Sequence, residues 1–399
     1  IRERIAHQSD GIFFLRIEDT DKKREVEGAT EKLISGLTKY AIHIDEGKKL
    51  DGTEAGEYGP YVQSHRAEIY RTFAQFLVSR GRAYPCFCTP DELDAVHKSQ
   101  ELKKVRPGYY KEHAICRLKT HEEAQKLIND GKSYIIRFRS EGNFDIKISI
   151  IDLIKGEREL SQNDHDAVII KSDGLPTYHF AHAVDDHLMG TTDVIRGDEW
   201  FSSLPLHIEL FTALEFPLPR FGHLSPIQKM DGTSRRKLSK RKDPEANIEF
   251  YESEGYPVEA VIEYLLNLAN SNFEDWRVGH IFDNNRDFKI ALEKLPQSGA
   301  LFDIAKLQSI SKEVIARFPT KEVCERALNW TTAFDSDLAK QIENDQTYAI
   351  KIFDIERGGA EKVRKDIGKW KDLQGEIGYF FDELFAPDAK LIAKELSTL

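Results

Sequence analysis

The chain has 399 residues, 40% hydrophobic and 31% charged, which is typical of a folded protein of roughly two or three domains. Its net charge is −11, which excludes a protein that binds nucleic acid through a uniformly basic surface. No apolar run reaches the roughly eighteen residues that a membrane-spanning helix needs, and the first residues do not resemble a signal peptide, so we expect no membrane association. The 4 cysteines are too few for a disulfide framework in a chain of this length, which predicts a reducing compartment, the cytoplasm.

The first strong element is the apolar run Ile12–Ile17, which predicts a strand buried on both faces of a parallel sheet. Glu18–Asp21 follows directly and carries three carboxylates in four residues. Ligands of open α/β sheets bind outside the carboxyl ends of the strands, so this acidic cluster is placed to bind a substrate ammonium group. Alternatively, Asp19, Thr20 or Asp21 caps the helix that follows, and both roles can hold at once.

A helix is predicted after Gly59–Arg66, because apolar residues recur at helical spacing from Ile69 to Leu77 before Gly81 ends the pattern. We interpret it as core structure. A short strand is predicted at Tyr134–Phe138 within a segment of mixed helix and strand.

Cysteines follow this helix in the pattern Cys86-Phe87-Cys88, with Cys116 downstream. A Cys-x-Cys pair brings two thiolates together, and a distant Cys with a nearby His could complete a tetrahedral zinc site. His113, Tyr110 and His121 compete as fourth ligand, and we rank His113 first. The alternative is a metal-free cluster, because no second closely spaced pair is present.

Further strands are predicted at Ala167–Lys171 and at Asp193–Ile195, where Arg196 stands at the strand end. A guanidinium there can hold a carboxylate through two parallel hydrogen bonds. The alternative is that Arg196 pairs with its neighbours Asp198 or Glu199.

The most basic stretch is Arg235–Lys242, which follows an apolar segment at Phe221–Ile227 and a predicted turn at Asp231–Ser234. Closely spaced ammonium groups on a loop can bind a polyphosphate. The alternative is a solvated charge run or a nucleic-acid patch.

Helices are predicted at residues 247–255 and 257–270, and only helical patterns recur from there to Leu399, which indicates an all-helical domain. Cations near Trp370 predict either a surface for RNA or a solvated helix face; they are Arg357, Lys362, Arg364, Lys365, Lys369 and Lys371.

Four motifs of this chain resemble the bacterial glutamyl-tRNA synthetases, a family of class I aminoacyl-tRNA synthetases. They are Arg16–Asp21, Gly59–Arg66, the dense segment Lys171–Trp200 and the loop Lys237–Arg241. The resemblance is strong from residue 12 to about residue 275 and weak in the helical tail. Some bacterial members carry a structural zinc ion in the inserted segment, with the third cysteine followed by arginine, as in Cys116-Arg117 here.

The resemblance implies a role for each matching position. Glu18 would hold the α-amino group of glutamate, and Tyr178, His182 and Arg196 would line the amino-acid pocket with Trp200 near it. Tyr178 as a core aromatic and His182 as an ordinary helix histidine stay open as alternatives. Asp185, Asp186 and His187 look like a metal or acid–base cluster, but the family uses this segment to shape the fold. Lys237, Leu238, Ser239 and Lys240 would bind ATP with Mg²⁺, and Lys237 and Lys240 would be catalytic.

The implied architecture is α/β: a Rossmann-like parallel-sheet catalytic domain with an inserted α+β module for the tRNA acceptor end, followed by an all-α C-terminal domain. We expect the two catalytic halves at residues 1–84 and 166–245 and the insertion at 85–165. A helical stem-contact region would follow at 246–310, and an anticodon-binding domain at 311–399.

The expected activity is the attachment of L-glutamate to tRNA(Glu) through a glutamyl adenylate by a monomeric enzyme. One alternative is the shorter paralogue that attaches glutamate to queuosine in tRNA(Asp), which the long helical tail disfavours. The other is a non-catalytic tRNA-binding regulatory protein. The first signature of the class, a His-x-Gly-His-like motif, is not found ahead of Arg16, and we expect it upstream of Ile1.

Overall fold

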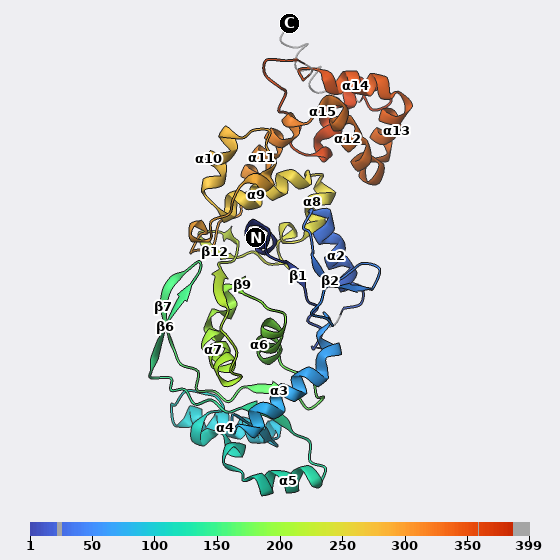
Figure 1. The fold of residues 1–399 in the computed structure, drawn as a ribbon. Coiled ribbons are helices and arrows are strands. Elements are labelled where there is room, and N and C mark those ends of the chain that lie inside the picture. The colour runs from blue at the N-terminus through green and yellow to red at the C-terminus, as the bar shows by residue number, and fades with distance from the viewer. Residues whose placement is uncertain (22–25, 358, 386–399) are drawn as a thin grey trace. The chain divides into compact units, whose positions relative to one another are not determined.

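The structure is a computed structural model that describes residues 1–21, 26–357 and 359–385 (Figure 1). The described residues fold into two compact units, the first comprising 1–225 with 290–293 and the second comprising the rest. The segment 290–293 joins the first unit through Gln8. The side-chain amide of Gln8 donates to the carbonyl of Ile290 (3.0 Å) and accepts from the N–H of Ile290 (2.7 Å). This division puts the loop Lys237–Arg241 in the second unit, whereas we expected it within the second catalytic half. No helix in the described ranges is long and apolar enough to cross a membrane.

The N-terminal part of the first unit contains a small mixed sheet of order β1-β2-β3. Its β1 pairs in parallel with β2, as a strand of a parallel sheet should. Burial on both faces is wrong, because Ile12 is 58% exposed and Phe14 and Leu15 are only half-buried at the edge of this sheet. The elements are α1 (Arg2–Gln8), β1 (Phe14–Leu15), α2 (Ala29–Lys39), β2 (Glu46–Lys48) and β3 (Glu54–Ala55).

The central sheet of the first unit has the order β7-β6-β10-β9. Its β10 pairs in parallel with both β6 and β9, and β7 adds an antiparallel edge. In another part of the first unit, the predicted core helix α3 packs with α6 and α7 around Tyr70, Phe180 and Leu210, which are fully buried. The elements are η1 (Gln63–Arg66), α3 (Ala67–Ser79), β6 (Lys147–Asp152), β7 (Gly156–Ser161), α6 (Tyr178–Leu188), β9 (Asp193–Gly197), η4 (Asp198–Ser203), α7 (Leu204–Ala213) and β10 (Arg220–Leu224).

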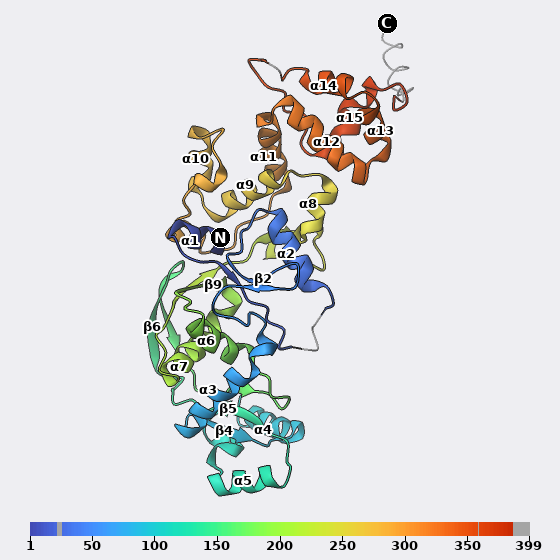
Figure 2. The same cartoon turned by 45° about the vertical axis from the view of Figure 1, so that its right-hand side comes forward.

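The inserted segment is built on a third sheet, of order β4-β5-β8, and its helices α4 and α5 lie next to that sheet at one end of the first unit (Figure 2). Both helices begin with a Thr capping box, at Thr89 and Thr120. The strand predicted at 167–171 forms as β8, but it pairs antiparallel with β5 of the insertion and does not extend the parallel sheet. The elements are β4 (Ala83–Cys86), α4 (Pro90–Leu102), η2 (Lys111–His113), η3 (Ile115–Leu118), α5 (His121–Asn129), β5 (Ile135–Phe138) and β8 (Val168–Ile170).

The second unit opens with the antiparallel hairpin β11–β12 and is otherwise helical among the described residues, which confirms the all-helical tail. Gly255 ends α8 in the left-handed conformation, where a Cβ atom would lie 2.9 Å from Trp370. The elements are β11 (Gln228–Asp231), β12 (Ser234–Lys237), α8 (Ile248–Glu254), α9 (Val258–Ala269), α10 (Asn272–Gly279), α11 (Ile304–Arg317), α12 (Thr320–Phe334), α13 (Ser336–Asn344), α14 (Gln346–Asp354) and α15 (Leu373–Ile377). Short 3-10 helices include Pro244–Ala246, Asn285–Asp287, Trp370–Asp372 and Gly378–Phe380.

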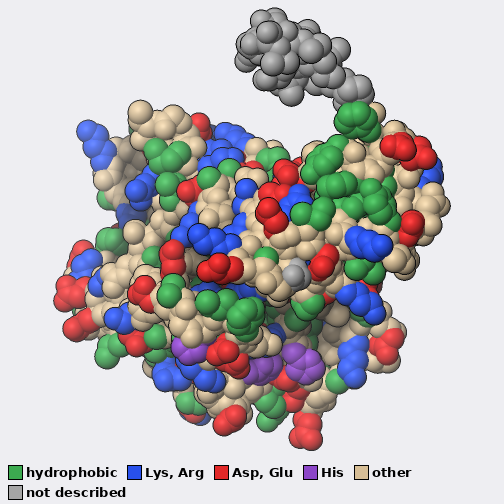
Figure 3. All heavy atoms as spheres, turned by 90° about the horizontal axis from the view of Figure 1, so that it is seen from above, with side chains coloured by type: hydrophobic (Ala, Val, Ile, Leu, Met, Phe, Trp, Pro, Cys, Tyr) green, Lys and Arg blue, Asp and Glu red, His purple; other side chains and the backbone are tan. Residues whose placement is uncertain are grey.

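The RNA surface predicted around Trp370 is not supported by the contacts there. Trp370 is only 5% exposed and belongs to the core of the C-terminal helices, so it cannot stack on an RNA base. Lys369 and Lys371 both contact the carboxylate of Glu254, and Arg357 is buried against backbone carbonyl groups. On the face drawn in Figure 3, basic and acidic side chains are interspersed. Lys369, Lys371 and Arg357 therefore make contacts within the fold.

Candidate active site

Arg196 stands near the end of β9 and is buried, with only 4% of its surface exposed. Its Nε donates to His223 Nε2 over 3.0 Å, because the two residues are register partners on β9 and β10. Its Nη1 lies 2.9 Å from His207 Nδ1 and 3.3 Å from His182 Nε2. The remaining nitrogen, Nη2, is buried and makes no hydrogen bond with the described residues.

Histidines surround this guanidinium where an acidic partner would be expected. The hydrogen-bond partners of Arg196 recorded here are three histidines, and Asp198, one of the two alternative partners, lies 3.5 Å from the ammonium group of Lys155. Burial lowers the pKa of Arg196 and holds the pKa of His207 well below its ordinary value. A buried cation whose hydrogen-bond partners are neutral is unfavourable, so this guanidinium is chemically suited to an anionic ligand.

An aromatic wall flanks the guanidinium. Tyr178, the first residue of α6, stacks on Trp200 with ring centroids 4.1 Å apart and lies parallel to the His182 ring at 5.6 Å. Burial raises the pKa of Tyr178, which keeps the phenol protonated. The structure thus brings Tyr178, His182, Arg196 and Trp200 together, as the sequence predicted.

Glu18 is joined to Arg196 by a chain of charged side chains. Glu18 Oε1 lies 3.2 Å from Arg16 Nη2, and Arg16 Nη1 donates to Asp186 over 2.9 Å. Asp186 in turn lies 2.8 Å from Nδ1 of His182, which contacts Arg196. Glu18 itself is partly exposed, with 41% of its side chain accessible, so its carboxylate can still accept a ligand. A carboxylate that can accept a cation and a guanidinium that can bind an anion therefore stand at the two ends of one network of contacts.

The other acids have structural partners. Asp19 accepts hydrogen bonds from the N–H (2.8 Å) and the hydroxyl (2.6 Å) of Ser64. The N-cap residue of α2 is Gly28, and no side chain caps this helix. The capping role predicted for the acidic cluster is therefore wrong. Asp185 is fully buried and accepts from Gln63, Arg66 and Tyr70. These contacts agree with a fold-shaping role for Asp185 and leave it no open position for a metal.

The lysine loop lies in the second unit and follows a turn at Asp231–Ser234 that forms as predicted. Asp243, which is 2% exposed, anchors the loop: it accepts two hydrogen bonds from Arg236 (2.6 and 2.8 Å) and one from the N–H of Ser239 (2.8 Å). The hydrogen bond from Arg236 holds the pKa of Asp243 well below its usual range. Lys237 and Lys240 are exposed, and the ammonium group of Lys240 has no partner among the described residues. The backbone of the loop is thus anchored at Ser239, and the side chains of Lys237 and Lys240 are exposed.

The sulfur atoms of Cys86, Cys88 and Cys116 lie within 4.8 Å of one another. The Tyr109 hydroxyl lies 3.5 Å from Cys86 Sγ and 3.2 Å from Cys88 Sγ. The hydrogen bond with Cys116 lowers the pKa of Cys86 to about 4, which favours a thiolate. The predicted fourth ligand, His113, is outside this group; its ring packs edge-on against Tyr110 with centroids 5.2 Å apart. This geometry does not support His113 as the fourth ligand, because the Tyr109 hydroxyl lies beside the sulfur atoms and the ring of His113 is not part of their group.

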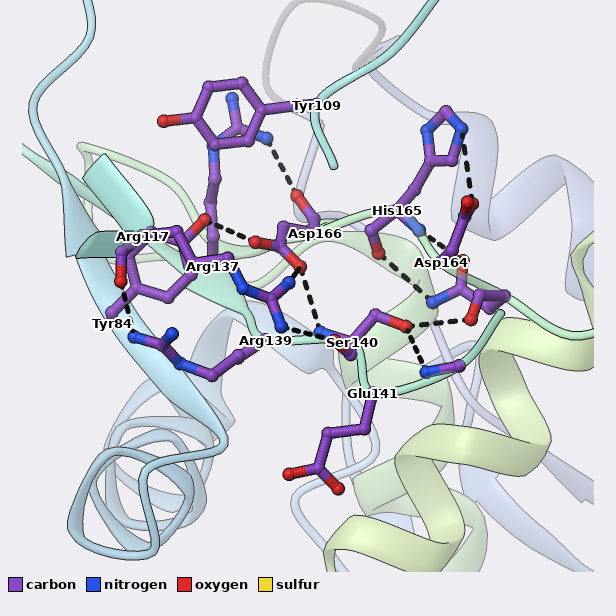
Figure 4. Close-up of polar contacts among 12 residues, drawn as sticks. Tyr84, Tyr109, Arg117, Arg137, Arg139, Ser140, Glu141, Asp164, His165 and Asp166 are labelled. Atoms are coloured by element: carbon purple, nitrogen blue, oxygen red, sulfur yellow. Dashed lines mark hydrogen bonds and ion pairs between the residues drawn. The ribbon is translucent and has the colours of Figure 1, made fainter. Parts of the chain in front are cut away.

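A buried network holds the cysteine-bearing segment on the sheet (Figure 4). Asp166, 1% exposed, accepts from Tyr84 Oη (2.6 Å), Arg117 Nη1 (2.6 Å) and the N–H of Ser140 (2.9 Å). Arg137 donates to the Asp166 carbonyl (2.9 Å), and its guanidinium lies 4.0 Å from the centroid of the Tyr109 ring. The contacts of the protein itself therefore hold the three cysteines close together.

Comparison with known proteins identifies the family. The model of the catalytic domain of class I tRNA synthetases (E and Q) matches residues 4–309. The glutamate–tRNA ligase of Clostridium beijerinckii is 51% identical over 96% of this chain and 69% of its own length, and that of Clostridium perfringens is 48% identical over 96% and 70%.

This chain belongs to the glutamyl-tRNA synthetases. A crystal structure of the glutamate–tRNA ligase from Elizabethkingia meningosepticum in complex with its amino acid has the same fold, with a TM-score of 0.81 at 29% identity over 98% of this chain and 78% of that one. Membership of this synthetase family confirms the predicted fold class and favours the ligase over both alternatives.

The sequence did not reveal the residues that hold Arg196 in this synthetase. His207 lies in the apolar helix α7 and His223 in the apolar strand β10, and both are fully buried. A histidine inside an apolar run was the available signal, since a buried imidazole requires a hydrogen-bond partner.

Proposed function

We propose that this chain joins L-glutamate to tRNA(Glu) in two steps. The α-carboxylate of glutamate attacks the α-phosphorus of ATP, which forms glutamyl adenylate and releases pyrophosphate. A hydroxyl of the terminal tRNA ribose then attacks the carbonyl carbon, and AMP leaves. The observation that carries this choice of substrate is the buried guanidinium of Arg196, whose Nη2 makes no hydrogen bond within the described part of the chain.

The amino acid is held at both of its charged ends. Arg196 binds the side-chain carboxylate of glutamate, and Glu18 binds the α-ammonium group. The stacked rings of Tyr178 and Trp200, with His182, form the wall between them. The fixed network between Glu18 and Arg196 supports this assignment, because preorganised partners lose little entropy when the substrate binds.

The lysine loop acts on ATP. Leu238 and Ser239 carry the backbone that approaches the nucleotide, and Lys237 and Lys240 stabilise the negative charge that develops on the phosphates during adenylate formation. Mg²⁺ accompanies ATP and neutralises phosphate charge. The exposed ammonium group of Lys240 beside an anchored backbone supports this role, since a flexible cation can follow the moving phosphates.

The inserted module holds one structural zinc ion through Cys86, Cys88 and Cys116. Their clustered sulfur atoms fit the soft thiolate set that zinc prefers, and the Tyr109 hydroxyl is the fourth polar group beside them. The ion would crosslink the segments on either side of α4 and take no part in the chemistry.

The remaining assignments follow the five segments expected from the sequence. Residues 85–165 bind the tRNA acceptor end, residues 246–310 contact the stem, and residues 311–399 bind the anticodon. The enzyme works as a monomer in the cytoplasm. Light scattering of the purified 45.8 kDa chain tests the monomer, and a mass twice as large would refute it.

Charging assays test the activity. Purified tRNA(Glu), tRNA(Gln) and tRNA(Asp) are each incubated with the protein, ATP and labelled glutamate. We expect label on tRNA(Glu) that a mild base releases, as an ester does. Label on tRNA(Asp) alone would establish the paralogue, and tRNA binding without any charging would establish the regulatory protein.

A further inference from the structure

Three adjacent parallel strands place Asp152, His223 and Arg196 in a row. Asp152 ends β6, His223 lies on β10 and Arg196 lies on β9, with β10 between the other two. His223 and Arg196 are register partners, and Phe221 pairs with Asp152. The row is buried, since Asp152 is 2% exposed and His223 0%.

The hydrogen bonds in this row fix the proton on His223. A guanidinium only donates, so His223 Nε2, 3.0 Å from Arg196 Nε, must accept. The proton of the neutral ring is then on Nδ1, which lies 2.6 Å from Asp152 Oδ2. The other carboxylate oxygen of Asp152 accepts from the N–H groups of Ile154 (2.9 Å) and Lys155 (2.8 Å), which fixes the carboxylate in turn.

The other partners of Arg196 lie on α6 and α7. His182 and His207 must also accept from Nη1, and each is fixed by a second contact, at 2.8 Å from Asp186 and at 2.8 Å from His179 respectively. They define one end of the guanidinium, whereas His223 is the hydrogen-bond partner recorded for Nε among the described residues. Without His223 the guanidinium plane can rotate about the Nη1 contacts.

We propose that Asp152 and His223 are positioning residues for substrate selection: together they fix the plane of the Arg196 guanidinium, so that Nη2 is left for the side-chain carboxylate of glutamate. The proposal rests on the proposed role of Arg196 as the carboxylate-binding residue. Neither Asp152 nor His223 touches the substrate. Their effect is on affinity and on the choice of glutamate over glutamine, because only the anionic side chain requires an oriented guanidinium.

Two near-isosteric substitutions separate positioning from packing. In His223→Asn the amide nitrogen replaces Nδ1, which keeps the contact with Asp152 and removes the acceptor for Arg196. In His223→Gln the amide oxygen can replace Nε2 and accept from Arg196. Both remove the same buried ring, so thermal unfolding shows whether their loss of stability is similar.

The assay is the equilibrium binding of L-glutamate and L-glutamine to the full chain by calorimetry. Losing a charge-assisted hydrogen bond weakens binding by about ten- to a hundredfold, so we expect that loss for glutamate in His223→Asn and a loss of about threefold or less in His223→Gln. Glutamine affinity should change little in either. Equal glutamate affinities in the two variants, or losses that only follow their stability, would overturn the proposal.

A second measurement does not depend on activity. In protein labelled with ¹⁵N at histidine, His223 Nε2 should have the shift of an unprotonated acceptor nitrogen at neutral pH, and Asp152→Asn should disturb it. A protonated Nε2 in the wild-type protein would also overturn the proposal. If the wild-type protein has the predicted tautomer but binds no glutamate, the assigned substrate is wrong and the positioning of Arg196 stands.

Discussion

Replacing Arg196 with lysine tests the site most directly. The guanidinium contacts His223 with one nitrogen, His182 and His207 with the second, and leaves the third for the ligand. An ammonium group is a single point and cannot reach all three positions. Arg196→Lys therefore loses the contact with the substrate or the contacts that orient it.

The size of the effect follows from burial. Removing one partner of a buried, hydrogen-bonded charge pair costs about 2–5 kcal/mol, or about thirtyfold to several thousandfold in Kd. Burial lowers the pKa of the guanidinium here, and it would also lower that of a lysine, which starts closer to neutrality. We therefore expect glutamate to bind Arg196→Lys at least about a hundredfold more weakly than wild type at pH 7.

Calorimetric titrations with glutamate and glutamine measure this loss, and the ratio of their kcat/KM values in charging measures discrimination. The affinity for glutamate should fall and the affinity for glutamine should not, because only the side-chain carboxylate of glutamate pairs with Arg196. Arg220→Lys is the matched control, since Arg220 begins the neighbouring strand β10 with 68% of its side chain exposed and pairs with Asp193. Glutamate affinity within threefold of wild type in Arg196→Lys would refute the role of Arg196. An equal loss for both ligands would place the α-carboxylate there instead.

Three further predictions concern the lysine loop, the cysteines and acid stability. Lys240→Ala should lower the rate of ATP–pyrophosphate exchange, measured with tRNA present, by about a hundredfold or more without unfolding the chain. Arg241→Ala, on the same loop, is the control and should have a much smaller effect. An unchanged exchange rate in Lys240→Ala would exclude this lysine from catalysis. Protein purified without a histidine tag should contain about one zinc ion per chain. The variant Cys88→Ser should lose this zinc, and the control Cys324→Ser, whose change lies in the helical tail, should keep it. Wild-type protein that stays metal-free after zinc supplementation would contradict the site. The pKa of Asp152 is about 2 in the folded chain against an ordinary 3.8, chiefly because hydrogen bonds from His223 and nearby N–H groups outweigh the effect of burial. The ionised Asp152 therefore stabilises the folded chain fully above about pH 4, and this stabilisation is lost as the pH falls towards 2. Over that range the free energy of unfolding, measured in urea, should fall by roughly 2 kcal/mol more in wild type than in Asp152→Asn. Parallel pH curves for the two proteins would contradict this prediction.

The features that contiguous or periodic residues encode could be predicted from the sequence alone. Glu18 directly after a strand, Arg196 at a strand end, the lysine loop after a turn and the helical tail are all encoded within short segments. Such features can be predicted because a strand, a turn and a helix are specified mainly by neighbouring residues. The grouping of Tyr178, His182 and Arg196 was expected from the resemblance of Lys171–Trp200 to the family, and the structure brings these side chains together.

Contacts between distant segments were decided only by the tertiary structure. Asp19 binds Ser64 and caps no helix, His113 lies away from the cysteines, and β8 pairs with the insertion. Arg196 is held by histidines 11 to 27 positions away along the chain, on a strand and helices whose register brings them to one point. Register and packing depend on the whole core. Local sequence therefore carries the chemical groups of this site, while the fold decides which of them meet and which nitrogen of Arg196 makes no hydrogen bond with the described residues.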